Sequence, residues 1–324
     1  MLNKLLSKMH IKVLCMILFF VMGVAFIAVK VKGKAEGVKF VIGMSQANLT
    51  EPWRISMNKE IISEAKKYKD LKVIYKDGGG DAEKQKNDIN ELLNSGVDLL
   101  IVSINDLKKL EPVVSRAHKE IPVIVLDRGI EGCDYTLYIG PDNKRIGKKA
   151  GEFVAELVGD KKSNVIEVQG VLDSVPSLEM SQGFREVIKK HPNIKIEDTV
   201  IGEWQRDEVE DDMKNLLRDN RDIDVIFAQN DYMALGAYKA AQSNGLNNVK
   251  IIGVDALSGK DGGLDLVEKG VLEGTFTCST GGKEAVDYAM NILMGRSNVP
   301  KTVILKSERI TRSNVYKYLN EKYK

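Results

Sequence analysis

The chain has 324 residues, which is enough for two α/β domains that each bury a core of their own. Lys and Arg number 48 against 46 Asp and Glu, and the resulting net charge of +2 disfavours nucleic acid as a partner, because no strong field would hold a polyanion. A hydrophobic content of 43% with only 6% aromatic residues is typical of parallel sheets rich in Val, Ile and Leu.

The N-terminal region contains one long apolar stretch. Residues 13–29 (VLCMILFFVMGVAFIAV) are seventeen uncharged positions with lysines on both sides. A bilayer span needs about 17 to 20 apolar residues, whereas signal-peptide cores have about 7 to 15. We therefore expect an uncleaved transmembrane anchor at 13–29, after a cytoplasmic segment at 1–12 and before a linker at 30–37. A cleaved signal peptide is the alternative, although small residues at a cleavage site are poorly placed.

Beyond residue 37 the sequence alternates between short apolar runs and amphipathic stretches. Strands are expected at 40–42, 71–74, 99–102, 123–126, 165–166, 225–227, 251–252 and around Phe276. Helices are expected at 55–68, 82–94, 107–119, 177–190, 207–218, 234–243 and 283–294. Strands that alternate with helices of this length predict an α/β fold with parallel sheets covered on both faces.

Short polar or charged residues follow five of the expected strands. They are 45–48, Ser103, Asp127 with Arg128, Asn230 with Asp231, and Asp255. Ligands of open α/β sheets bind beyond the carboxyl ends of the strands, so this repetition predicts one polar pocket. Each residue also has a purely structural interpretation: Asp231 could cap a helix, and Asp127 could be a turn residue.

Several segments resemble the periplasmic sugar-binding proteins of the ribose-binding type. They are 52–54 (PWR), 123–128 (VIVLDR), 140–143 (GPDN), 227–236 (FAQNDYMALG) and 253–255 (GVD), and the resemblance runs from about Val38 to about Arg312. It implies two Rossmann-like lobes with parallel sheets, joined by three hinge crossovers and closing on a ligand. The first lobe would comprise 38–140 and 279–308, and the second 141–278 and 309–324.

The resemblance also implies a set of sugar contacts. Asp127 and Arg128 would grip ring or anomeric hydroxyls, Asn230 and Asp255 would bond other hydroxyls, and Trp53 and Trp204 would cover apolar sugar faces. Such roles suit sugars, whose C–H patches fit aromatic rings and whose hydroxyls bond strongly to charged groups. Core packing is the alternative for both tryptophans. The full candidate set is Glu51, Trp53, Arg54, Ser103, Asp127, Arg128, Trp204, Asn230 and Asp255.

The sequence departs from the ribose-binding pattern at three places. Trp53-Arg54 stand where ribose binders have two phenylalanines, 178–180 (LEM) stand where they have an arginine, and Cys278 replaces a glutamine. Glu51 and Arg54 could recognise a different hydroxyl pattern, or could form an exposed pair worth about 0–1 kcal/mol. A pentose, especially D-xylose, is the expected ligand, partly because the chain resembles membrane-anchored xylose sensors.

No catalytic, metal or cofactor motif is found. Gly78-Gly79-Gly80 lack the lysine of a phosphate-binding loop, and there is no G-x-S-x-G. Asp127 and Asp255 could act as an acid and base in a glycosidase, but hydroxyl binding explains them without a reaction. Cys15, Cys133 and Cys278, like the three histidines, have no spacing typical of a disulfide or a metal site. We expect a binding protein without a cofactor.

Two functions fit an anchored sugar-binding domain outside the cell membrane. Related sugar-responsive repressors carry a DNA-reading motif where this chain has its apolar stretch, so an extracytoplasmic location is expected. Closure could be signalled to a membrane histidine kinase, or the protein could deliver sugar to an ABC permease. A fixed tether raises the effective concentration of a partner-bound sensor, which favours the kinase.

Overall fold

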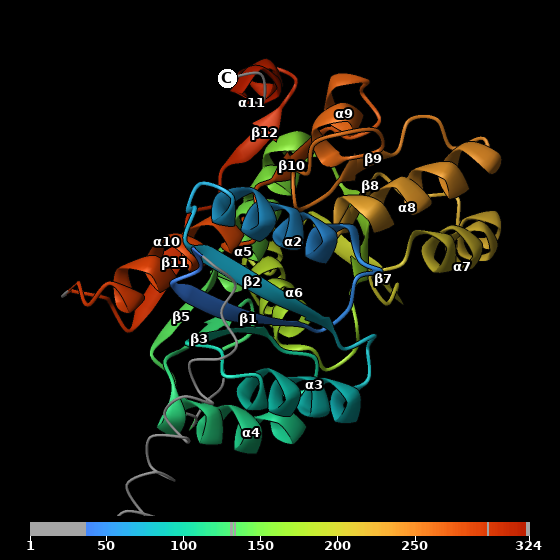
Figure 1. Cartoon of the computed structure of the whole chain (residues 1–324). Coiled ribbons are helices and arrows are strands. Elements are labelled where there is room, and N and C mark those ends of the chain that lie inside the picture. Colours follow the sequence, from blue (N-terminus) through green and yellow to red (C-terminus); the bar gives the residue numbers. More distant parts are fainter. Residues whose placement is uncertain (1–36, 130–131, 133, 297, 322–324) are drawn as a thin grey trace, which may run out of the picture.

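The first lobe is a six-stranded sheet between two pairs of helices. Its strands are β1 (Phe40–Gln46), β2 (Leu71–Asp77), β3 (Leu99–Ser103), β4 (Val123–Leu126), β5 (Leu137–Pro141) and β11 (Thr302–Leu305). Helices α2 (Pro52–Ala65) and α10 (Gly282–Leu293) pack on one face, and α3 (Ala82–Asn94) and α4 (Leu107–Glu120) on the other (Figure 1). The sheet is therefore buried on both faces, as its apolar strands require.

The second lobe repeats this plan. Its strands are β6 (Ser163–Gln169), β7 (Ile194–Ile201), β8 (Val225–Ala228), β9 (Lys250–Ile252), β10 (Gly274–Phe276) and β12 (Arg309–Thr311). Its helices are α5 (Asn143–Val158), α6 (Val175–Ile188), α7 (Arg206–Asp219), α8 (Asp231–Ser243), α9 (Gly263–Glu268) and α11 (Val315–Glu321). Figure 1 shows α5 and α6 beside each other, and α7 beside α8. Phe184 and Phe227 stack in the core with ring centroids 4.5 Å apart.

The strand order explains how the two lobes are connected. It is β11-β5-β4-β3-β1-β2 in the first sheet and β12-β10-β9-β8-β6-β7 in the second, and only the β10–β12 pair is antiparallel. The chain passes between the sheets after β5, after β10 and between β11 and β12. Thr277 and Glu308, in the second and third of these passages, are joined by backbone and side-chain hydrogen bonds of 2.9 and 2.8 Å. The expected two-lobed α/β fold is confirmed.

Polar caps begin several helices at the carboxyl ends of the strands. The carboxylates of Asp81, Asp106 and Asp142 accept hydrogen bonds from backbone N–H groups in the first turns of α3, α4 and α5. Each cap satisfies a backbone donor that the helix itself leaves unpaired. The sequence prediction missed strands β5, β7, β11 and β12 and helices α5, α9 and α11.

The computed structural model describes residues 37–129, 132, 134–296 and 298–321. The predicted transmembrane anchor at 13–29 and the segments on either side of it at 1–12 and 30–36 lie outside these residues. In the described part of the chain, no helix is both long and apolar enough to span a bilayer.

Candidate ligand-binding cleft

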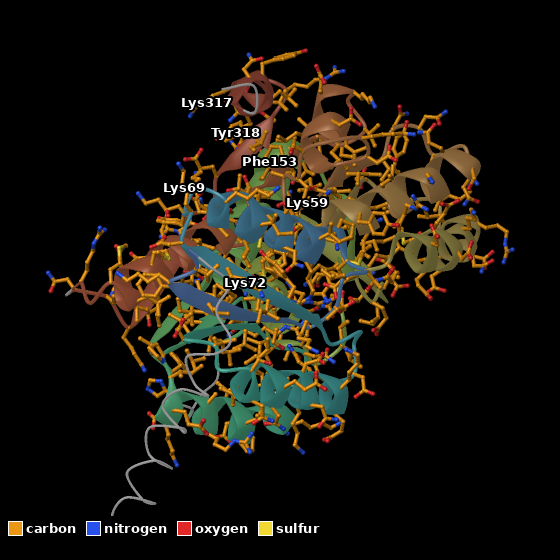
Figure 2. The ribbon with its side chains drawn as sticks, viewed as in Figure 1. Lys59, Lys69, Lys72, Phe153, Lys317 and Tyr318 are labelled. Atoms are coloured by element: carbon orange, nitrogen blue, oxygen red, sulfur yellow. The ribbon has the colours of Figure 1, made fainter. Side chains whose placement is uncertain are left out.

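A cavity of about 650 Å³ lies between the lobes, at the carboxyl ends of both sheets. Side chains from both lobes line it, and they include Glu51, Trp53, Arg54, Lys59, Glu60, Asp127, Arg128, Asn143, Met180, Trp204, Gln229, Asn230, Asp231, Asp255, Lys260 and Cys278. Of the predicted site residues, only Ser103 is not part of this lining. Figure 2 labels Lys59, an exposed side chain of α2 that borders the cavity.

Arg54 is the centre of a buried ionic network on the first lobe. Its side chain leaves the first turn of α2, is only 2% exposed, and donates from Nη2 to Asp127 Oδ2 at 3.2 Å. Its Nε lies 3.2 Å from Glu51 Oε2, and its Nη1 donates to Ser103 Oγ at 2.6 Å. Ser103 therefore lies behind Arg54 and positions it. The alternative of an exposed Glu51–Arg54 pair is wrong, because the strand ends of β3 and β4 enclose the guanidinium.

Arg128 extends this network along the same wall. Its Nε lies 3.6 Å from Asp127 Oδ2, and its Nη1 donates to the backbone oxygen of Asn105 at 3.0 Å. Burial lowers the pKa of Arg128, and the neighbouring Asp127 carboxylate acts in the opposite direction. Asp127 has a left-handed φ of 71°, and its backbone oxygen accepts a hydrogen bond from Tyr138 Oη at 2.9 Å. The turn therefore directs two adjacent charged side chains to one place.

Trp53 joins the first lobe to a crossover. Its Nε1 donates to the backbone oxygen of Cys278 at 2.6 Å, and its ring packs against the apolar cores of both lobes. Cys278 is a free thiol, 7% exposed, and burial is the first cause that raises its pKa. The indole thus borders the cavity at the hinge.

Trp204 belongs both to the cavity wall and to the core of the second lobe. It is 7% exposed and has a φ of 62°. A Cβ atom on Gly170 would lie 2.1 Å from Trp204 Cζ2, so the ring needs a glycine beneath it. Its buried Nε1 has no hydrogen-bond partner among the described residues. Core packing and exposure to the cavity are therefore both present in this side chain.

Asn230 is the N-cap of α8. Its Oδ1 accepts from the backbone N–H of Met233 at 2.7 Å, which leaves its amide nitrogen for a ligand. The structural interpretation of Asp231 as the cap is wrong, because Asp231 is the first residue of the helix.

Asp231 and Asp255 place two carboxyl groups in the second-lobe wall. Asp231 is 3% exposed, its Oδ2 accepts from the backbone N–H of Ala256 at 2.7 Å, and its Oδ1 has no partner among the described residues. Burial raises the pKa of Asp231 to about 7, while hydrogen bonding from the Thr275 side chain and the Ala256 backbone acts in the opposite direction. Asp255 has a φ of 115°, and burial, followed by the charge of Asp231, raises its pKa as well. The sequence prediction did not include Asp231 among the ligand contacts.

Glu60 is a further lining residue that the sequence prediction missed. It accepts a hydrogen bond from Thr280 Oγ1, and burial raises its pKa. Helical spacing could have identified it, because Trp53, Ser56 and Glu60 share one face of α2 at intervals of three and four residues.

This arrangement suits the recognition of hydroxyl groups. The wall offers guanidinium donors, carboxylate acceptors and two indole rings, a combination that matches polar edges and apolar C–H faces of a ring. Within the described ranges, no group of three or more His, Cys, Asp or Glu side chains could hold a metal ion.

Comparison with known proteins supports the same interpretation. The model of the periplasmic binding protein domain matches residues 42–297. The ribose import binding protein RbsB of Bacillus subtilis is 32% identical over 82% of this chain and 85% of its own. The galactofuranose-binding protein YtfQ of Escherichia coli is 29% identical over 79% and 81%.

Among solved structures, the fructose-binding periplasmic domain of a hybrid two-component system is similar over 88% of this chain and 95% of its own. Its TM-score is 0.82 and its sequence identity 37%. The family model covers most of the chain, and both lobes take part in each of these matches. The chain therefore belongs to the periplasmic binding protein family.

Proposed function

We propose that this protein binds a monosaccharide in the cleft between its lobes and closes around it without changing it chemically. One observation carries the proposal: charged strand-end side chains from both lobes line a single cavity of about 650 Å³. A ligand that contacts both walls stabilises the closed arrangement, because only closure completes its contacts. The ribose, galactofuranose and fructose specificities of the relatives support a sugar as the ligand.

The proposed contacts follow from the network of the first lobe. Arg54, Asp127 and Arg128 would bond hydroxyls or the ring oxygen, with Glu51 and Ser103 holding Arg54 in place. From the other wall, Asn230 and Asp255 would bond the remaining hydroxyls. Trp53 and Trp204 would pack on C–H faces of the sugar. A pentose such as D-xylose is our first candidate.

Calorimetry on the full chain in lipid nanodiscs tests the ligand. The panel is D-xylose, D-ribose, L-arabinose, D-fructose and D-galactose, with mannitol as a linear control. We expect saturable heat with at least one sugar and a higher melting temperature in its presence. If no monosaccharide produces heat, the proposed function is wrong; a hexose as the tightest ligand would overturn only the pentose.

We further propose that closure is signalled to a membrane histidine kinase that controls sugar uptake. The support is the 37% identical fructose-binding domain, which belongs to a hybrid two-component system, and the apolar stretch at 13–29, which would tether the domain. The alternative is delivery to an ABC permease, which the similarity to ribose import proteins favours.

Deletion of the gene in the native host separates these two roles. A sensor would be needed for sugar-induced transcription of the uptake genes, and uptake of labelled sugar would persist when the transporter is expressed constitutively. A delivery protein would show the reverse pattern. Complementation with the Asp127→Ala variant serves as the control that ties either phenotype to the cleft.

A further inference from the structure

The two walls of the cleft differ in how their carboxylates are neutralised. On the first lobe, Glu51 and Asp127 lie within 3.6 Å of the Arg54 or Arg128 guanidinium. On the second lobe, neither Asp231 nor Asp255 forms an ion pair with a described residue, and Asp231 is the more deeply buried. Two carboxylates without a counter-ion in one buried place cannot both ionise cheaply.

Backbone contacts place Asp231 beside the segment that carries Asp255. The Asp231 N–H donates to Val254 O at 2.7 Å, and Asp231 Oδ2 accepts from Ala256 N at 2.7 Å, so its contacts bracket Asp255 on both sides. Glycines enclose the Asp231 carboxylate: a Cβ on Gly253 would lie 2.1 Å from Oδ1, and one on Gly263 would lie 1.9 Å from Oδ2. The Asp231 carboxylate therefore occupies space that only glycine at 253 and 263 leaves free.

This inference rests on the proposed sugar binding. We propose that Asp231 and Asp255 share one proton in the ligand-free protein, and that a sugar hydroxyl donating to Asp255 displaces this proton to the solvent. A hydrogen bond donated to a carboxylate favours its charged form, so the pair gives up its proton as the sugar takes its place. Asp231 would be a positioning residue, which acts on the sugar through Asp255 and the segment 253–263.

The other charged groups around Asp231 and Asp255 favour retention of the proton. The acidic or neutral groups around Asp255 are Glu51, Asp127 and Cys278. The cations of the opposite wall, Arg54 and Arg128, are already paired with carboxylates. Lys260 lines the same cavity as an exposed side chain. The raised pKa of both second-lobe carboxyls, caused by burial, agrees with a retained proton.

Calorimetry in two buffers counts the proton directly. The full chain is titrated at pH 7 with the tightest sugar of the panel, in PIPES and in Tris, whose ionisation heats differ. We expect a difference in binding heat that corresponds to release of up to one proton, and an affinity that rises by as much as about tenfold per pH unit where the pair titrates. Equal heats in both buffers, or uptake of a proton, would overturn the proposal.

Two variants assign the proton to the pair. Asp231→Asn keeps the acceptor for Ala256 but removes one carboxyl, so its affinity should rise less steeply from pH 6 to 8 than that of the wild type, and an equally steep rise would overturn the proposal. Asp212→Asn, an exposed carboxylate of α7 that does not line the cavity, is the matched control and should retain the wild-type dependence. If Asp231→Asn does not fold, the wild-type buffer comparison still decides. Absence of any sugar heat would instead contradict the proposed function.

Discussion

In the first-lobe wall of the cleft, Glu51 and Asp127 are paired with arginines, whereas Asp231 and Asp255 in the second-lobe wall have no such partner among the described residues. Arg54 is held by Ser103, Asp127 and Glu51. Trp204 Nε1, like Arg54 Nε and Arg128 Nε of the first wall, is buried without a hydrogen-bond partner in the described part of the chain. Buried polar atoms without partners are costly, so such atoms at a cleft indicate where a ligand would supply bonds. Ion pairs therefore preorganise the first wall, whereas the carboxylates of the second wall lack a counter-ion within the described ranges.

Asp127→Ala is expected to have the largest effect, because it breaks the first wall. It leaves the buried Arg54 and Arg128 without their shared partner, and loss of one member of a buried ion pair typically costs about 3–5 kcal/mol. We expect loss of sugar binding by calorimetry and a lower melting temperature. Asp127→Asn, which keeps the shape and a hydrogen-bond acceptor, should be less damaging. Wild-type affinity in the alanine variant would place the sugar elsewhere.

Gly170→Ala tests the second wall. The added methyl would meet the Trp204 ring at 2.1 Å, and overpacking of this kind costs about 1–3 kcal/mol. Displacement of the indole should weaken sugar binding and change the tryptophan fluorescence. Gly129→Ala is the control, since its methyl would contact Tyr138 Cε2 at an ordinary 3.6 Å. Equal behaviour of the two variants would argue against Trp204 as part of the wall.

The pH dependence of stability sharpens the comparison further. Burial raises the pKa of Asp231 to about 7 in the folded protein, so the folded state holds a proton that the unfolded chain releases near its ordinary value of 3.8. Stability from this group is therefore full at low pH and is lost as pH rises through 7. From pH 6 to 8, we expect the free energy of unfolding without sugar to fall by on the order of 1 kcal/mol. Urea melts of the wild type and Asp231→Asn at pH 6 and pH 8 measure this fall in the free energy of unfolding. An equal fall in both proteins would show that Asp231 is not its cause.

Trp53→Phe should have the smallest effect. It keeps an aromatic ring between the two cores but removes the Nε1 hydrogen bond to Cys278 O, which is worth about 0.5–1.5 kcal/mol. Because this bond ties α2 to a crossover, we expect a slightly larger radius of gyration without sugar and a modest loss of affinity. Small-angle scattering with and without sugar measures the first. A variant that scatters like the wild type in both states would exclude Trp53 as a restraint on opening.

The sequence predicts most of the central strands because fully buried parallel strands are continuous apolar runs. Segments 99–102 and 123–126 are examples, and both are completely buried. Strand β7 was missed because it is an edge strand with exposed Lys195 and Glu197, and β5 because it ends in Gly-Pro. Edge strands face solvent, so their composition resembles that of loops.

The sequence predicted that residues at the strand ends line the site, but it did not predict which side chains contact one another there. Arg54 is buried by Ser103 and Asp127, which are 49 and 73 positions away in the sequence. Asp231 is isolated from solvent between Gly253 and Gly263, and nothing beside it in the sequence indicates that burial. Local pattern predicts which residues reach the cleft, whereas tertiary contacts decide their charge state.

The last two strands of the chain, β11 and β12, make each lobe depend on the C-terminal segment. Strand β11 closes one edge of the first sheet, and β12, beginning four residues after β11 ends, closes an edge of the second. Removal of the chain from residue 302 onward would therefore expose an edge in both lobes at once. Neither lobe can be obtained by a single cut, so a reporter built from this protein should be fused at a surface loop or after α11 (Val315–Glu321).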